Sequence, residues 1–386
     1  MNFTYLIMAA VLFMAACTPE NNQTETPPVY DSWLPLGPEE LAGWEENGSS
    51  SWNEEILELP AGNNWLSSSG TYNDFQWEME VNAPAGGAIG FRLADDNSHY
   101  WVNLDFDSAS MHPSGTILEV ARAKVLQNHQ PDQWHKLRVE AKGTQLRVFL
   151  NDTLVSAAHD KRSLSGSIAL KAGSETMRVR NQKIMLWQQK EHTPLLEDRF
   201  RADSTRQWQT FFEESLEGWD PTGDAQWDLQ DGVLHGICGE QSSWLVSQAS
   251  YHNFYFSTQF KIIKEDNSGI FIRKHPDTVG VSLQDAIECN IYDHNGPEHA
   301  YGTGSMVFQA RSWYGMIDYD DWNTMEIFAE DDHVVVYVNG VKASEAQVEK
   351  AFNKPGQIAL QAGTRVFTDN GPSDIYFKDL KIKSMD

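Results

Sequence analysis

Apolar residues recur at every second position through most of the chain, in short segments that turn residues separate. Such alternation is the pattern of β-strands with one buried face. Asn339-Gly340 stands between two apolar runs and is typical of a hairpin, because both residues accept positive φ. No stretch keeps a helical period beyond a turn or two, and 345–351 is the best candidate. The clearest alternating segments are 254–262, 269–273, 287–293, 324–329 and 334–339. The pattern predicts an almost wholly β protein.

The pattern occurs twice along the chain. Intervals between aromatic residues agree in the two halves, and both halves end in similar strands, IALKAG at 168–173 and IALQAG at 358–363. The matching pairs are Trp44–Trp52 with Trp219–Trp227, eight residues apart, Trp65–Phe75 with Trp244–Phe254, ten apart, and Trp134–Asn151 with Trp322–Asn339, seventeen apart. Tryptophans at repeat positions are expected in the cores. Roughly ten or more short strands per copy fit a jelly-roll β-sandwich, so we expect two all-β domains, at 33–189 and 196–386.

The N-terminus has the features of an export signal. Residues 3–16 form one apolar stretch that is too short to span a bilayer comfortably, which suits a signal peptide at 1–16. The stretch ends in Met-Ala-Ala-Cys, which resembles the lipobox of bacterial lipoproteins, so Cys17 is the predicted lipidation site. Residues 17–32 have the composition of a flexible tether. An ordinary secretory signal, with Cys17 incidental, is the alternative. We expect a cell-envelope protein, lipid-anchored at the outer membrane or cell surface of a Gram-negative bacterium.

Composition narrows the range of partners. The chain has 386 residues and a formal charge of −26, from 29 Lys and Arg against 55 Asp and Glu. This balance argues against nucleic acid as a partner, and against docking on an anionic membrane through a basic face. The lipid on Cys17 is the expected membrane contact. Fourteen Trp in an acidic chain point to a ring-shaped ligand such as a carbohydrate, although packing in the core is the favoured explanation for any single Trp.

Two cysteines remain in the body of the chain. Cys238 and Cys289 are 51 residues apart and follow no metal-binding spacing. They could pair in an oxidising compartment. Because Cys289 sits in an alternating strand, a buried free thiol is the favoured interpretation.

The alternation also divides the second copy into faces. Ile287, Cys289 and Ile291 form the apolar set of one strand, so Glu288 and Asn290 belong to the opposite, outer face. The same argument assigns three further polar side chains to that face, namely Tyr292, Arg273 and Gln361. One acid, one cation and several hydrogen-bonding groups are thus candidates for a site, although a plain solvated surface also explains them.

A long loop, 293–319, follows the Glu288 strand and is rich in rings and hydrogen-bonding groups. Tyr301, Arg311 and Trp313 lie in it and suit stacking on a pyranose ring and bonding to its hydroxyls. Familiar catalytic motifs are absent from the sequence: it has no Gly-Xaa-Ser-Xaa-Gly elbow, no Walker loop and no His-Glu-Xaa-Xaa-His helix. Acidic clusters such as 318–321 offer oxygen ligands for Ca²⁺, but solvated turns are the favoured explanation.

The second copy resembles the 3-keto-disaccharide hydrolase domain family over essentially all of 196–386. The resemblance is carried most specifically by Asn267-Ser-Gly-Ile-Phe-Ile-Arg273 followed by Ile287-Glu288. Further matching stretches are 227–234, 251–254, 303–305, 321–323, 338–341, 356–361 and 375–382. The resemblance implies a concanavalin-like jelly roll and activity on 3-keto-glycosides.

The first copy resembles the same fold without the polar set. Gly86-Gly-Ala-Ile89 stands where the second copy has Asn267-Ser-Gly-Ile. Arg92 is kept, whereas alignment of the apolar positions puts Asn103 at the place of Glu288 and Lys171 at that of Gln361. Since an amide cannot act as a base, we expect the first copy to be a degenerate, non-catalytic partner or a sugar-binding module.

The resemblance implies an elimination mechanism with the following roles. A ketone at sugar C3 acidifies the C2 proton, so a base near C2 can start cleavage of the glycosidic bond. Glu288 is the expected base, and Arg273 stabilises the enolate oxygen. No cofactor is firmly expected; the alternative to Arg273 is a divalent metal, Ca²⁺ or another, held partly by Glu288 and Asp293. The expected substrate-binding residues are Asn267, Asn290, Tyr292, Gln361, Arg311, Trp313 and Tyr301.

The rival hypothesis is a surface lipoprotein that binds carbohydrate without catalysis. A third reading, a structural interaction module, predicts binding of no sugar.

Overall fold

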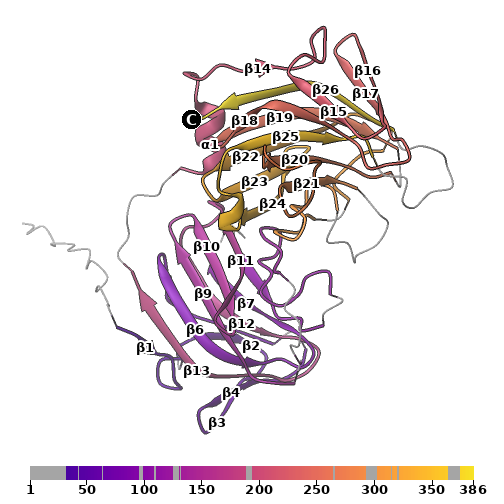
Figure 1. The fold of residues 1–386 in the computed structure, drawn as a ribbon. Coiled ribbons are helices and arrows are strands. Elements are labelled where there is room, and N and C mark those ends of the chain that lie inside the picture. The colour runs from indigo at the N-terminus through magenta and orange to yellow at the C-terminus, as the bar shows by residue number, and fades with distance from the viewer. Residues whose placement is uncertain are drawn as a thin grey trace, which may run out of the picture.

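The computed structural model describes residues 32–386 except 42, 63, 95–98, 108–109, 125–129, 131, 188–193, 264–265, 293–301, 314, 320 and 364–373. These residues form two β-sandwiches in succession (Figure 1). Each sandwich combines an eight-stranded and a five-stranded antiparallel sheet. The predicted all-β fold of two tandem sandwiches is therefore confirmed. Within the described ranges, no helix combines the length and apolar character needed to cross a membrane.

The first sandwich is built as follows. In spatial order, its larger sheet contains β11 (Thr153–His159), β10 (Gln145–Leu150), β9 (His135–Lys142), β6 (Phe75–Asn82), β13 (Met177–Leu186), β4 (Ile56–Leu59) and β3 (Ser51–Asn53), with β1 (Leu34–Pro35) paired to β13. Its smaller sheet contains β2 (Glu45–Asn47), β5 (Trp65–Ser67), β12 (Ser167–Ala172), β7 (Gly87–Leu93) and β8 (Tyr100–Asn103).

The second sandwich repeats this order strand for strand. Its larger sheet contains β16 (Gln226–Gln230), β17 (Val233–Ile237), β26 (Asp374–Ser384), β19 (Phe254–Ile262), β22 (Asn323–Glu330), β23 (His333–Val338) and β24 (Val341–Gln347), with β14 (Gln209–Thr210) paired to β26. Its smaller sheet contains β15 (Trp219–Thr222), β18 (Trp244–Tyr251), β25 (Gly356–Gln361), β20 (Ser268–Lys274) and β21 (Ile287–Ile291). The internal repeat in the sequence is thus a repeat of topology.

Alternation predicted the core of the second sandwich correctly. Ile287, Cys289 and Ile291 of β21 lie between the sheets, as do Ile270 and Ile272 of β20. The thiol of Cys289 is buried and free, as favoured from the sequence. The period of two in these strands therefore reports real burial on one face.

The predicted hairpin at Asn339-Gly340 joins β23 to β24, and both residues have positive φ, 49° and 77°. The weak helical signal at 345–351 was wrong. β24 continues to Gln347, because Ala346 and Val348 alternate into the core, and only a 3-10 turn, Lys350–Phe352, follows.

A short helix that the sequence pattern did not reveal covers the larger sheet of the second sandwich. Helix α1 (Leu196–Ala202) places Leu196 and Phe200 against Tyr255, Phe328 and Val335. Only two apolar side chains make this contact, too few for a visible helical period. The helix occupies the outer face of that sheet, which leaves the outer face of the five-stranded sheet as the candidate binding face.

One fully buried arginine holds an end of the second sandwich together. Arg273 has φ 55° and lies where the pairing of β20 with β25 shifts register, so it forms a bulge that interrupts the alternation of the strand. Its guanidinium donates to the backbone oxygens of His252 at 2.8 Å, Asp331 at 2.5 Å and Phe352 at 3.1 Å. These oxygens belong to three different connections between strands, so one side chain ties both sheets.

Arg92 repeats the arrangement in the first sandwich. It has φ 50° and is fully buried, and its guanidinium donates to the backbone oxygens of Asn73, Gly143 and Ser163. A carboxylate is added here, because Asp74 lies 3.2 Å from Arg92. The arginine shared by the two copies is therefore part of the scaffold.

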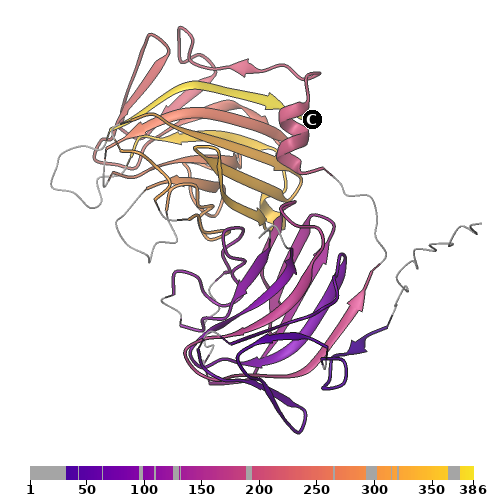
Figure 2. The same ribbon diagram turned by 180° about the vertical axis from the view of Figure 1, so that it is seen from behind.

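The two sandwiches meet at edge strands β11 and β24 (Figures 1 and 2). Lys342 Nζ donates to the backbone oxygen of His159 at 2.7 Å and to Glu345 Oε2 at 2.9 Å, and lies 3.4 Å from Glu197 Oε1. The His159 N–H donates to Glu345 Oε1 at 2.9 Å. Burial opposes a charge on Glu345, but Lys342 and His333 outweigh it and lower the pKa of Glu345 to about 2. A buried ion-pair network thus joins the domains.

Replacing Arg273 with Met removes the side-chain donor from three carbonyl groups, of which that of Phe352 is buried and those of His252 and Asp331 are partly buried. We expect the Arg273→Met variant to lose at least about 3 kcal/mol of unfolding free energy, because three acceptors lose bonds to a charged group, at about 1.5–3 kcal/mol each, and the partly exposed carbonyl groups recover some of this by bonding to water. Chemical denaturation followed by tryptophan fluorescence measures the loss. Arg178→Met, which removes a half-exposed ion pair with Glu58, is the control and should stay within about 1 kcal/mol of wild type. Equal stabilities for the two variants would contradict the scaffold role.

The interdomain network gives a second prediction. Lys342→Met leaves the carboxylates of Glu345 and Glu197 buried without their cation, so we expect a loss of about 3–5 kcal/mol of unfolding free energy. Lys161→Met breaks an exposed ion pair with Asp198 near the same junction and is expected to lose less than about 1 kcal/mol. Denaturation measures stability, and small-angle scattering measures whether the domains separate. A Lys342→Met protein as stable as Lys161→Met would overturn the assignment.

Candidate functional site

The outer face of the five-stranded sheet in the second sandwich carries a row of polar side chains. Trp244 on β18 is opposite Gln361 on β25, and Gly269 on β20 is opposite Asn290 on β21. The two pairs are neighbours, because Ile270 is opposite Leu360 one position away. Strand register alone therefore brings an indole, two amides and a glycine into one line across the sheet.

Glu288 lies two residues before Asn290 on β21 and therefore on the same face. Its carboxyl group is directed toward this row of polar side chains. The residue opposite Glu288 is Phe271, which belongs to an apolar outer cluster with Val246, Ala286 and Ala359. A Cβ placed on Gly269 would lie 2.8 Å from Glu288 Oε1, so the carboxyl group rests over the glycine. The bulk of Phe271 and the space above Gly269 together direct the acid toward the amides.

This environment changes the acidity of Glu288. Its exposed fraction is 8%, and burial raises its pKa to about 7. Among the described residues, no cation forms an ion pair with it. A carboxyl group with this pKa is populated in both protonation states near neutral pH, so it can either accept or donate a proton.

Two neighbouring groups have unused hydrogen-bonding capacity. Gln361 Oε1 and Trp244 Nε1 are buried and have no hydrogen-bond partner among the described residues. Buried polar atoms usually have hydrogen-bond partners, so two such atoms beside Glu288 on the outer face of the sheet point to a ligand that supplies the missing partners. Trp244 was missed from the sequence because its repeat position suggested a core residue. Its position one residue before the core residue Leu245 is the signal that would have placed it outside.

The predicted cation, Arg273, is not on this face. The positive φ turns its side chain into the end of the sandwich, where three carbonyl groups hold it. The assignment of Arg273 to the enolate oxygen was therefore wrong in geometry. Alternation failed at this residue because a bulge resets the period.

The remaining predicted residues are distributed as follows. Asn267 is half-buried just before β20, and Tyr292 is buried just after β21. Tyr301, Asp293 and Cys17 lie outside the described residues. Arg311 and Trp313 are at the junction of the two sandwiches. There the Arg122 guanidinium lies 4.7 Å from the Trp313 ring centroid, and His112 lies beside it, so the first sandwich contacts the ring that was expected to stack on sugar.

The first sandwich carries different side chains on the equivalent face. Gly90 is opposite Trp101 and Ala88 is opposite Asn103, so Trp101 corresponds to Glu288 and Asn103 to Asn290. The predicted equivalence of Asn103 with Glu288 was thus off by two residues, a slip that alternation cannot detect. Lys171 does correspond to Gln361. The place of the acid is taken by an indole, and the Lys171 ammonium lies 6.0 Å from its ring.

The described residues do not form a convincing metal site around Glu288. They offer one carboxylate with a raised pKa and two amides, fewer than the six to eight oxygen ligands that Ca²⁺ takes, and because the second predicted ligand, Asp293, lies outside the described residues, the metal alternative stays a prediction. A cluster with metal-ligand spacing occurs instead at the domain junction, in His159, His333 and Glu345. Its carboxylate already accepts from His333 Nε2 at 2.7 Å and from Lys342. We therefore interpret that cluster as an ion-pair network.

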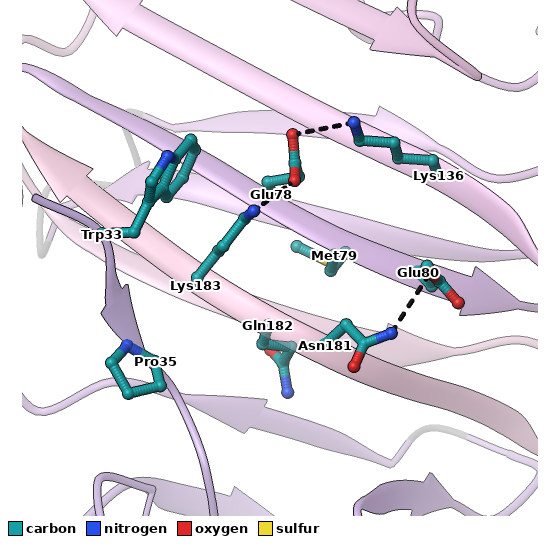
Figure 3. A pocket seen from close by; sticks show the side chains of 9 residues that line it. All are labelled: Trp33, Pro35, Glu78, Met79, Glu80, Lys136, Asn181, Gln182 and Lys183. Carbon is teal, nitrogen blue, oxygen red and sulfur yellow. Dashed lines mark hydrogen bonds and ion pairs between the residues drawn. The ribbon is translucent and has the colours of Figure 1, made fainter.

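A cavity of about 590 Å³ lies elsewhere, on the larger sheet of the first sandwich (Figure 3). Glu78 lies between Lys183 at 2.8 Å and Lys136 at 3.3 Å, and Asn181 donates to Glu80. The two lysines that line this cavity therefore both form ion pairs with Glu78.

The cavity holds none of the predicted site residues. The side-chain amide of Gln182, which also lines it, is buried without a hydrogen-bond partner among the described residues. Burial opposes the charge on Glu78, but the two lysines outweigh burial and lower the pKa of Glu78, whereas the pKa of Glu288 beside Gln361 is raised.

Solved structures with related folds each match about one domain of the chain. A candidate glycosyl hydrolase from Parabacteroides distasonis ATCC 8503 is 22% identical, covering 46% of this chain and all of that one, with a TM-score of 0.39. The carbohydrate-binding module CBM66 from Bacillus subtilis is 24% identical, covering 37% and 95%, with a TM-score of 0.32. A β-glucanase from Bacillus licheniformis is 12% identical, covering 47% and 98%, with a TM-score of 0.32.

Comparison with curated proteins gives no match. The family model of the 3-keto-alpha-glucoside-1,2-lyase-like domain matches residues 35–185 and again 207–383. These two segments correspond to the two sandwiches and together cover most of the chain. The protein therefore belongs to the 3-keto-alpha-glucoside-1,2-lyase-like domain family, in two tandem copies, and its function is directed at carbohydrates.

Proposed function

We propose that the second sandwich cleaves the glycosidic bond of 3-keto-glycosides, with Glu288 as the proton-transferring group. The observation that carries this proposal is the position of Glu288, a buried carboxyl group that forms no ion pair with a described cation, over Gly269 and beside two amides on the outer face of the five-stranded sheet. A structural carboxylate would normally be paired or exposed. Family membership supports a carbohydrate as the substrate, and the 3-keto group is the part that the experiment below tests.

The reaction is an elimination followed by hydration. The Glu288 carboxylate takes the proton from C2, which the C3 ketone acidifies, and the electron pair passes to the C3 oxygen as an enolate. The enolate then re-forms the C3 ketone, and the electron pair forms the C1=C2 double bond. The bond from C1 to the glycosidic oxygen breaks, and that oxygen takes a proton from the protonated Glu288 or from water. Water then adds its hydroxyl to C1 and its proton to C2, which completes net hydrolysis.

Neighbouring groups stabilise the developing charge. The amide groups of Asn290 and Gln361 supply N–H donors on the same face as Glu288, suited to the enolate oxygen and to ring hydroxyls. The Trp244 indole next to Gln361 adds a ring surface and an unused N–H. No step requires Arg273 or a metal ion.

In this proposal the first sandwich binds sugar without cleaving it, because an indole replaces the acid. Trp101 lies over Gly90, with ring atoms 2.8 Å from a Cβ built there, and Lys171 adds a hydrogen-bond donor. The proposal places the protein at the cell envelope, where Cys17 would tether it.

Glu288→Gln keeps the shape of the side chain and removes the base. We expect release of product from a 3-keto-disaccharide to fall at least 100-fold, because general base catalysis contributes about 10²–10⁴. NMR of the reaction mixture, with and without chelator, detects the released sugar. The control is Glu349→Gln, which alters an exposed glutamate.

Retained activity in Glu288→Gln would remove Glu288 from the mechanism. Binding of the 3-keto-disaccharide by wild type without product would favour the non-catalytic alternative. Binding of no sugar would favour a structural module.

The raised pKa of Glu288 predicts two opposite pH effects. As a base Glu288 must be ionised, so kcat/KM is expected to rise with pH through about 7 and then level off. Stability moves the other way. A carboxyl group whose pKa is raised on folding contributes stability at low pH that is lost as the pH rises through the folded value. Wild type should therefore lose stability relative to Glu288→Gln between about pH 4.5 and 7. A constant difference between the two unfolding curves would contradict the buried, unpaired carboxyl group.

A further inference from the structure

A cavity of about 270 Å³ lies where the two sandwiches meet. One wall comes from 122–124 of the first sandwich and the other from 306–311 of the second. Both walls continue from the same small hairpin of the repeat, since Ile117 bridges Ala121 as Met306 bridges Ala310. The repeat therefore places Arg122 and Arg311 at equivalent positions and brings both to one cavity.

The charge of this cavity is opposite to that of the protein. Arg122, Lys124 and Arg311 line it, and none of the described residues that line it is acidic, although the chain carries a net charge of −26. Neither arginine forms an ion pair with a carboxylate among the described residues, and Arg122 Nε is buried without an acceptor. Burial and the charge of Arg311 lower the pKa of Arg122 to about 10, and burial lowers the pKa of Arg311. The fold thus holds two like charges together, and no carboxylate among the described residues compensates them.

The surroundings hold the arginines ready for a ligand. Trp313 lies under the Arg122 guanidinium at 4.7 Å and limits its directions. Phe308, two-thirds exposed and in a left-handed conformation, adds an accessible ring to the same cavity. A planar guanidinium fork suits carboxylate and sulfate, and an exposed ring suits a sugar face.

The cavity is also connected to the proposed catalytic strand. The hairpin that forms its second wall hydrogen-bonds to β21, with the Val307 N–H donating to the backbone oxygen of Glu288 at 3.0 Å. A saccharide that extends from the outer face past the edge of β21 would meet this hairpin.

We infer that the interdomain cavity binds the carboxylate or sulfate group of an acidic saccharide through Arg122 and Arg311. This inference rests on the proposed carbohydrate function and specifies the ligand class as anionic. Lys124 and the Phe308 ring complete the site, and both sandwiches contribute to it.

Affinity electrophoresis in native gels tests the inference. The gels contain polygalacturonate for carboxylate, κ-carrageenan for sulfate, or neutral dextran. A protein of charge −26 is repelled by acidic polymers, so retardation by one of them requires a specific cationic site. We expect wild type to be retarded by at least one acidic polymer more than by dextran, and less so at high salt. Retardation in the polygalacturonate gel identifies carboxylate as the bound group, and retardation in the κ-carrageenan gel identifies sulfate.

Variants assign the retardation to the cavity. Arg122→Gln and Arg311→Gln should each reduce it at least tenfold in apparent affinity, without lowering the melting temperature, because each removes a like-charge repulsion. Arg178→Gln, an arginine paired with Glu58 on the first sandwich, should match wild type. The inference is overturned if no acidic polymer retards more than dextran does, or if all three variants behave alike.

The binding test is independent of catalysis. Glu288→Gln should keep the retardation even when it has lost turnover. Failure of turnover with retained retardation contradicts only the proposed reaction, and the reverse result contradicts only the anion site.

Discussion

A single buried guanidinium in a left-handed bulge fixes the geometry of each sandwich. Arg92 and Arg273 each donate to three backbone oxygens from three separate connections, so the ends of both sheets are tied at one point. The bulge requires positive φ, an unfavourable conformation that the surrounding bonds stabilise. Because these bonds hold the end of the sandwich, the outer face of the smaller sheet can vary without loss of the fold.

The two copies show this freedom directly. Opposite the same strand, the second copy has Glu288 facing Phe271 and the first has Trp101 facing Gly90. The position of the glycine on the neighbouring strand determines where the side chain at the Glu288 or Trp101 position lies, because only a glycine leaves room for it. In the second copy the large Phe271 excludes water from Glu288, and Gly269 leaves room for its carboxyl group, so packing produces the raised pKa. In the first copy Gly90 lies under the indole itself, which yields a flat ring in place of an acid.

Period-two alternation explains how much the sequence could predict. It assigned Ile287, Cys289 and Ile291 to the core correctly, and thereby put Glu288 and Asn290 on the outer face. Alternation carries no information at a bulge, which is why Arg273 was misplaced, and none about a shift of two residues, which is why Asn103 was matched to Glu288.

Contacts between distant parts of the chain were also beyond the sequence pattern. Trp313 contacts Arg122 only because the two sandwiches pack together. Helix α1 is held by two apolar residues that pack against a cluster containing Tyr255. Such pairings follow from tertiary packing, and no local period records them.

The junction between the sandwiches contains one compensated and one uncompensated group of charged side chains. We assign the first group to stability and the second to ligand binding. The buried ammonium group of Lys342 is compensated by the carboxylates of Glu345 and Glu197, so this cation needs no ligand from outside the protein. Around Arg122 and Arg311, the same junction keeps two cations without a carboxylate partner among the described residues. At this junction the packing of the two copies brings the equivalent positions Arg122 and Arg311 together, so the same residue type in both copies creates a like-charge pair. The chain has 55 acidic residues, and one of them near the cavity would remove the repulsion between Arg122 and Arg311. The compensated network already holds the domains together, so the uncompensated pair is unnecessary for stability, and an anionic ligand gives it a physical reason.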